Sequence, residues 1–188
     1  MGKLVDIHEA IQGLKEGKTL LYPTDTVWGI GCDCTNEQAI QRIITIKQRS
    51  PQKSFILLVD SVAMLERYVD NIPDVCYDLI DFASKPTTII YDTPNGLPTS
   101  LLAEDGSIAI RVTEDNLCKR MIQQLRKPIV STSANISGEP TAHNYSEINS
   151  IIKEQVDFVL NERLNEGMHA PSAIIKVGND YKVKVIRS

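Results

Sequence analysis

The sequence has few aromatic residues, no excess of basic residues and no long apolar run. Phe, Trp and Tyr make up 5% of the 188 residues. Lys and Arg number 20 against 24 Asp and Glu, so the formal net charge is −4, and any nucleic-acid binding must come from a local patch. The longest unbroken apolar run is Phe55 to Val59, well short of the roughly 20 residues of a membrane span. We therefore expect no membrane partner.

The chain also lacks the residue clusters of a metal site and the start of an export signal. The four cysteines are Cys32, Cys34, Cys76 and Cys118. None forms a CxxC pair, and the three histidines are scattered, so we expect no zinc site. Asp6 and Glu9 lie where a signal peptide would be cationic and then apolar. These features favour a reduced, cytoplasmic protein with ordinary thiols.

Apolar periodicity predicts helices and strands that interleave along the whole chain. Helices are expected at 6–17, from 36, from about 61, from about 74, at 114–125 and near 145–153. Strands are expected at 18–22, 55–59, 87–91, 107–112, 128–131 and near 157–160, 172–177 and 181–186. Residues 92–105 and 131–138 are expected to be loops. The pattern predicts one α/β domain over 1–188, with a mixed sheet and helices on its faces.

Two glycine-containing segments resemble phosphate-binding motifs but fail their context. Gly17-Lys18-Thr19 closes a helix and opens a strand, the reverse of a P-loop. Gly29-Ile30-Gly31 has no third glycine at the required spacing, and no helix opens there. We interpret it as a bend between a strand and a helix.

A cationic stretch without carboxylates is the first segment that suggests chemistry. From Gln38 to Val59 there is no Asp or Glu, while Arg42, Lys47, Arg49 and Lys53 are all cationic. Lys47 and Arg49 are two residues apart, so both point the same way in an extended backbone. Arg as a planar fork and Lys as a point charge can together grip a polyphosphate. A solvated basic loop is the alternative.

A polar segment without charge follows the strand predicted at 128–131. Residues 131–138 read STSANISG, and such a loop supplies neutral hydrogen bonds to phosphate or sugar oxygens, or else forms a cap and turn. In an extended backbone Ser131, Ser133 and Asn135 share one face, while Thr132 and Ala134 point the other way. We therefore expect Ser133 and Asn135 to meet a ligand and Thr132 to pack or cap.

Two further features are a polar turn and an isolated arginine. Residues 22–29 read YPTDTVWG, with two hydroxyls and one carboxylate after a proline. Alone, this turn is best explained as satisfying its own backbone. Arg111 interrupts an apolar alternating strand, on the face that it shares with Ser107 and Ala109. It is either exposed on a surface strand or lines a cavity as the partner of a carboxylate ligand.

Together these segments resemble the YrdC-like family, the threonylcarbamoyl-AMP synthases of tRNA modification. The matching stretches are 22–31, 47–59, 86–90, 107–112, 131–140 and 171–175, with Arg187 near the end. The resemblance implies a twisted, mixed-stranded α/β domain around a concave basic cavity. It also implies that L-threonine, bicarbonate and ATP yield L-threonylcarbamoyl-AMP and pyrophosphate. Separate enzymes would then pass the threonylcarbamoyl group to an adenosine beside the tRNA anticodon.

The resemblance assigns residues to each substrate. Threonine would be held by Thr26, Arg111, Ser131 and Ser172. ATP would be held by Lys47, Arg49, Lys53, Ser107, Ser133, Asn135, Thr141 and Arg187. Lys47 and Arg49 would be the catalytic pair, screening the charge of attacker and phosphate. No acidic metal cage is visible, so Mg²⁺ would arrive with ATP.

Three places depart from the family pattern, and two other functions remain open. Lys53 stands where members often have asparagine, although short-form members often have lysine, so a phosphate contact is still expected. Leu58 stands where many members have histidine, and Ser84-Lys85-Pro86 replaces the usual Pro-Gly-Pro, while the following Thr87 and Thr88 remain. One alternative is a non-catalytic module that binds double-stranded RNA or tRNA, although the basic stretch holds no Tyr or Trp for base stacking. The other is a carbamoyl-transferring enzyme, because related domains occur in hydrogenase-maturation proteins. Pyrophosphate release distinguishes the three functions.

Overall fold

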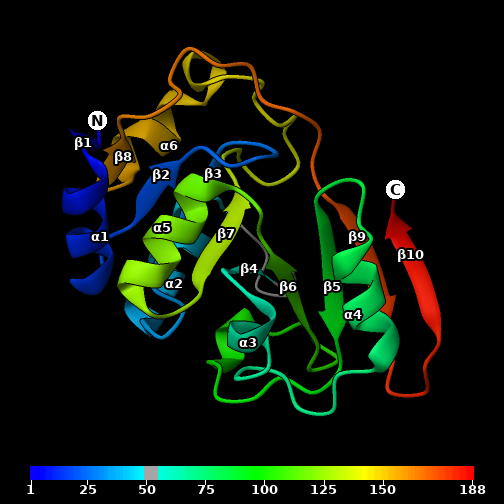
Figure 1. Ribbon diagram of the computed structural model, residues 1–188. Helices are drawn as coiled ribbons and strands as arrows, with labels where there is room; N and C mark the ends of the chain where they lie inside the picture. Colours follow the sequence, from blue (N-terminus) through cyan, green and yellow to red (C-terminus); the bar gives the residue numbers. More distant parts are fainter. Residues whose placement is uncertain (49–54) are drawn as a thin grey trace.

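The computed structural model describes residues 1–48 and 55–188 (Figure 1). Arg49 and Lys53 therefore lie outside the described residues. The helices are α1 Ile7–Lys15, α2 Glu37–Ile46, α3 Val62–Leu65, α4 Asp74–Asp81, η1 Thr99–Leu101, α5 Asn116–Leu125, η2 Tyr145–Glu147 and α6 Ser150–Gln155. The strands are β1 Lys3–Val5, β2 Leu20–Tyr22, β3 Gly29–Gly31, β4 Ile56–Val59, β5 Thr87–Tyr91, β6 Ile108–Val112, β7 Ile129–Ser133, β8 Phe158–Leu160, β9 Ala173–Val177 and β10 Val183–Arg187.

The strands form one ten-stranded sheet in the order β1-β8-β2-β3-β7-β4-β6-β5-β9-β10. Neighbours run parallel in pairs such as β4–β6 and β5–β9, and antiparallel in pairs such as β3–β7 and β5–β6. The mixed sheet with flanking helices confirms the predicted α/β class. Its order brings β3 and β7 beside β4 and β6, so segments distant in sequence meet near the middle of the sheet.

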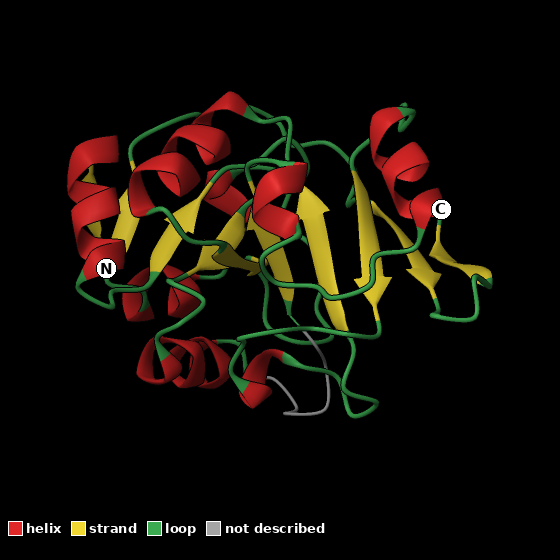
Figure 2. Cartoon of the chain, turned by 60° about the horizontal axis from the view of Figure 1, so that its bottom comes forward, coloured by secondary structure: helices red, strands yellow, loops and turns green. Residues whose placement is uncertain are grey.

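Helices lie on both faces of the sheet (Figure 2). Helix α4 covers one face of the sheet near β5 and β9 (Figure 1). Ile89 and Val112 line a hollow together with Leu79 and Ile80 of α4. Their neighbours in the chain, Ile90 and Arg111, line a different cavity. Because successive side chains of a strand point to opposite faces, the two hollows lie on opposite sides of β5 and β6.

The two long N-terminal helices form where local capping and periodicity predict them. The Asp6 carboxylate accepts a hydrogen bond from the Glu9 N–H at 2.9 Å, and the Asn36 side chain accepts one from Ala39 at the same distance. Each cap satisfies an N–H that the first helical turn leaves unpaired. Their apolar faces are buried.

Several predicted boundaries were wrong. β7 continues to Ser133, so the segment expected to be a loop from 131 begins as a strand paired with β3. The helix expected near 145–153 is divided into η2 and α6, because Ile148 is extended and buried and Asn149 caps a new helix through the Ile151 N–H. Within 92–105, Thr99–Leu101 forms a 3₁₀ turn.

Two strands were missed altogether. β1 and β3 have three residues each, too few to show a period of two. Gly29-Ile30-Gly31, expected to be a bend, is β3, and it pairs with β2 on one side and β7 on the other.

The four cysteines are free and buried. Over residues 1–48 and 55–188, no helix combines the length and the apolarity of a membrane span.

Candidate active site

A cavity of about 290 Å³, called here the ligand cavity, lies on the face of β5, β6 and β9 away from α4. Many of the residues predicted to bind ligands line it: Thr26, Arg111, Ser131, Ser133, Thr141, Ser172 and Arg187. Among the described residues that line it, the charged side chains are the two arginines. The cavity is therefore basic, as the resemblance implies.

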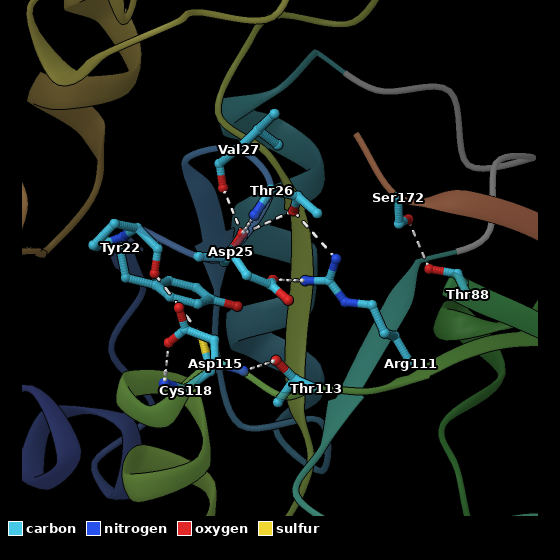
Figure 3. A network of polar contacts seen from close by, with 12 residues as sticks. Tyr22, Asp25, Thr26, Val27, Thr88, Arg111, Thr113, Asp115, Cys118 and Ser172 are labelled. Carbon is cyan, nitrogen blue, oxygen red and sulfur yellow. Dashed lines mark hydrogen bonds and ion pairs between the residues drawn. The ribbon is translucent and has the colours of Figure 1, made fainter. Parts of the chain in front are cut away.

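Arg111 is held in the wall of the cavity by two neighbouring residues of the polar turn (Figure 3). Its side chain is 5% exposed. Its Nη2 lies 3.1 Å from Asp25 Oδ1 in an ion pair, and its Nη1 donates to Thr26 Oγ1 at 3.2 Å. Burial raises the pKa of the Asp25 carboxyl, and the nearby guanidinium opposes that shift. The carboxylate compensates a cation that would otherwise be buried unpaired.

The hydroxyls of Thr24 and Thr26 form an ordered chain. Thr24 Oγ1 accepts from the Thr26 N–H at 3.0 Å and donates to the Val27 carbonyl oxygen at 2.9 Å. The 2.8 Å contact between the two hydroxyls must then use the proton of Thr26. Because Thr26 also accepts from Arg111, we infer that it offers the cavity one acceptor lone pair and no proton.

Ser172 shows the opposite polarity on the far wall (Figure 3). Its Oγ lies 2.8 Å from Oγ1 of the fully buried Thr88 and accepts from Arg187 Nη2 at 3.4 Å. Within the described part of the chain the Thr88 hydroxyl has no other partner, so donation to Ser172 is its favourable arrangement. The Ser172 proton is then available to a ligand.

The two arginines place like charges around one space. Arg187 Nε donates to the Ser172 carbonyl oxygen at 2.8 Å. Burial lowers the pKa of its guanidinium, and the charge of Arg111 lowers it further. A bound anion relieves this repulsion, because a charge-assisted hydrogen bond to either guanidinium stabilises both.

Lys47 lies beside the cavity rather than in its wall. The residue is 1% exposed, and its ammonium donates to the carbonyl oxygens of Ser133 and Asn135, the latter at 2.7 Å. The Ser137 N–H donates in turn to the Lys47 carbonyl oxygen. In this structure Lys47 holds the segment after β7 in place, and its predicted contact with ATP stays a prediction.

Asn135 and Ser107, also predicted to bind ATP, are not among the residues that line the ligand cavity. The Asn135 amide donates to the carbonyl oxygens of Ile136 and Glu139, because the extended backbone ends at Ser133 and alternation does not continue to Asn135. Ser107 donates to Asp105 in a turn at 2.6 Å. Thr132, expected to face away, lines the cavity beside Ser133. The predicted contacts of Asn135, Ser107 and Ser133 with ATP remain predictions.

Leu58, the position where many relatives have histidine, lines the cavity as an apolar side chain. Asp25 and Thr88 were missed as parts of the site. Asp25 had a signal, since it stands between two threonines after a proline, although that turn alone was best explained by its own backbone. Thr88 lies in the matching stretch 86–90, but the sequence does not show its role, because its hydroxyl acts through Ser172, 84 residues away.

The sequence matches a family model described as telomere recombination, the Sua5/YciO/YrdC model, over residues 12–188. The chain belongs to the Sua5/YciO/YrdC family. A threonylcarbamoyl-AMP synthase of Pseudoalteromonas translucida is 40% identical over 89% of this chain and 91% of its own. One from Acinetobacter baumannii is 34% identical over 90% of this chain and 92% of its own.

The fold also matches a solved member of the family. A P. abyssi Sua5 crystallised with L-threonine superposes with a TM-score of 0.81 at 24% identity, over 90% of this chain. The present chain spans 50% of that longer protein. At this identity the match shows the shared fold alone.

Proposed function

We propose that this protein is a threonylcarbamoyl-AMP synthase, a nucleotidyltransferase that acts on L-threonine, bicarbonate and ATP. Curated relatives at 30–40% identity over most of the chain carry that name. The observation that carries the proposal is the polarity of the ligand cavity, which complements an α-amino acid.

Hydrogen bonds within the protein fix the polarity of four groups that line the cavity, three donors and one acceptor. The hydroxyls of Ser131, Thr132, Ser133 and Thr141 can donate or accept. A carboxylate accepts only, and the cavity offers it the two guanidiniums and the Ser172 proton. An amine or hydroxyl of the ligand donates, and Thr26 offers it an acceptor. Threonine carries all of these groups within one small molecule, and a cavity of about 290 Å³ is close to the lower size limit of small-molecule sites.

The reaction needs alignment and charge screening more than acid–base groups. The neutral amine of threonine condenses with bicarbonate to a carbamate, with loss of water. A carbamate oxygen then attacks the α-phosphorus of ATP and pyrophosphate leaves, giving the mixed anhydride with AMP. Attacker and phosphate are both anionic, so nearby cations lower the barrier. We assign that role to Arg49 and Lys53 and, if it leaves its carbonyl partners, to Lys47.

The residues present do not form a dedicated metal site. In the ranges 1–48 and 55–188 no group of three or more His, Cys, Asp or Glu side chains is placed to hold an ion. Mg²⁺ therefore belongs to the proposal as part of the nucleotide substrate, bound by phosphate oxygens and water.

The nucleotide would extend from the ligand cavity toward its neighbour. A hollow lined by His143 and His169 shares Val27, Thr141 and Pro171 with the ligand cavity. ATP is far larger than threonine, and this continuity gives it room beside Thr141 and Ser133.

The RNA-binding alternative has less support. Duplex recognition uses phosphate contacts over an extended basic surface, whereas the paired arginines here face a cavity of small-molecule size. The proposal includes downstream enzymes that pass the threonylcarbamoyl group to tRNA. It also includes a cytoplasmic location, which the four free thiols support.

The test is pyrophosphate release from the purified protein. We expect release only when ATP, bicarbonate and L-threonine are all present. L-Valine, which matches threonine in shape but lacks the hydroxyl, should be poorer by about 100-fold or more in kcat/KM. Arg111→Ala should abolish the threonine-dependent release of pyrophosphate. Lys119→Ala, which removes the ion pair between α5 and the exposed Glu114 carboxylate, should leave that release unchanged. Release without threonine, or equal rates with valine, would contradict the proposal.

A further inference from the structure

We propose that Asp25 is a positioning residue, which holds the Arg111 guanidinium toward the ligand from a second cavity on the opposite face of the sheet. This inference rests on the proposed function for its kinetic consequences. The second cavity, called here the back cavity, has a volume of about 250 Å³ and lies between α4 and strands β5 and β6.

The polar turn divides its side chains between the two cavities. Thr24 and Thr26 line the ligand cavity, and Asp25 between them lines the back cavity. Asp25 nevertheless reaches Arg111, whose guanidinium lies between the carboxylate and the Thr26 hydroxyl (Figure 3). Asp25 thus contacts a ligand-cavity residue without lining the ligand cavity itself.

Two anchors fix a planar group better than one. Arg111 Nη2 lies 3.1 Å from the Asp25 carboxylate, and Nη1 lies 3.2 Å from Thr26 Oγ1. Each contact is made by a different nitrogen. The contact with Asp25 Oδ1 is an ion pair without hydrogen-bond geometry, so it attracts the guanidinium by charge, and the hydrogen bond to Thr26 gives direction. The Nε has no partner among the described residues, so neither Nε nor the backbone near it fixes that plane. Without Asp25 the guanidinium can rotate about the Cδ–Nε and Nε–Cζ bonds of Arg111, because the one hydrogen bond to the Thr26 hydroxyl does not prevent this rotation.

Asp25 compensates the buried Arg111 cation at a cost to itself. The side chain of Asp25 is 23% exposed, and burial raises the pKa of its carboxyl despite the attraction of Arg111 and Arg163, with Asp115 adding to the rise. An acid whose pKa is raised by folding is less favourable when ionised in the folded state than in the unfolded state. Removal of the carboxylate therefore acts on the fold and on Arg111 together, and the experiment needs a readout for each.

The back cavity has an open side through which a small anion can enter. Its rim residues Ala83, Ser84 and Lys85 are exposed, and Leu79 and Ile80 form an apolar wall. In an Asp25→Ala variant, formate would fit the space left by the carboxylate and pair with Arg111. It would enter without crossing the ligand cavity. Because the guanidiniums of the ligand cavity also attract carboxylates, the natural protein with formate measures any competition with threonine.

The experiment compares Asp25→Ala, Asp25→Asn and Arg111→Ala with the natural protein, with and without sodium formate. We expect Asp25→Ala to raise the KM for threonine about tenfold or more, with little change in the KM for ATP. It should also lower the melting temperature, because the buried Arg111 cation loses its partner. Formate should restore most of that loss in Asp25→Ala and none in Arg111→Ala. Sodium chloride at equal ionic strength is the control, and Asp25→Asn should stay impaired because an amide carries no charge.

A second readout needs no substrate. In the nitrogen-15 spectrum of the ligand-free protein, the Nη signals of a held guanidinium are separate, and rotation merges them. We expect separate Arg111 signals in the natural protein, merged signals in Asp25→Ala, and separate signals again with formate. Unchanged Arg111 signals in Asp25→Ala overturn the positioning role. If the natural protein releases no pyrophosphate, the proposed function fails, and these spectra still decide the role of Asp25.

Discussion

At the residue scale, the direction of single hydroxyl protons decides what the ligand cavity can bind. Thr88 is fully buried and contacts Ser172 Oγ at 2.8 Å. Thr88→Val removes this donor at nearly constant volume, so Ser172 loses the partner that directs its proton toward the ligand. We expect threonine affinity to fall by about 3- to 10-fold, the equivalent of one neutral hydrogen bond of about 1 kcal/mol. Isothermal calorimetry measures the change.

Thr87→Val is the matched control. Thr87 precedes Thr88 on the same strand, and its hydroxyl donates to the exposed Lys85 carbonyl at 2.9 Å. Its side chain lines the back cavity rather than the ligand cavity, so threonine affinity should not change. An equal loss in both variants would mean that β5 responds to any substitution, and the hydrogen bond from Thr88 to Ser172 would then have no special role.

At the element scale, β3 shows how closely backbones approach in the middle of the sheet. A Cβ on Gly31 would lie 2.2 Å from the Val130 carbonyl oxygen and 2.8 Å from the Tyr22 ring. Both obstacles belong to neighbouring strands, and a backbone oxygen cannot turn away as a side chain can. We expect Gly31→Ala to reduce the free energy of unfolding by about 1–3 kcal/mol or more, measured by urea denaturation. Gly167→Ala, where a Cβ would meet no atom within 4 Å, should be close to neutral.

The elements differ in how far the sequence alone predicts them. α1 and α2 were predicted closely because their caps and apolar faces are local. β3 was not, because a Gly-Ile-Gly segment becomes a strand only through β2 and β7, the latter about 100 residues away. Tertiary pairing also carried β7 past the predicted end at 131, through the contact of Ser133 with Gly29.

The residues of the site also differ in how far the sequence alone predicts them. Thr26, Arg111, Ser172 and Arg187 were assigned through a resemblance, and the structure brings them to one cavity. The sequence shows that Lys47 is a cation, but not that main-chain carbonyls 86 and 88 residues away accept its protons. Only the three-dimensional arrangement shows that Asp25 and Arg111 form a pair, since 85 residues separate Thr26 from Arg111.

At the scale of the whole molecule, the four buried thiols report on the integrity of the packed domain. Burial raises the pKa of every one, to about 11 for Cys76 and about 12 for Cys34. Near pH 8 about one Cys76 thiol in a thousand is ionised, against roughly a quarter of ordinary free thiols.

Alkylation of the folded protein should therefore be slow at all four cysteines. We expect iodoacetamide near pH 8 to leave the native protein unmodified while the unfolded protein gains four adducts by mass spectrometry. Because the thiol pKa values are higher in the folded state, unfolded thiols lose protons first as the pH rises above the pKa of a free thiol, about 8.5. Stability should be retained below that pH and decline above it, toward pH 11. Rapid labelling of one cysteine under native conditions would show local opening at its element, and Cys76 in α4 would then place that opening beside the back cavity.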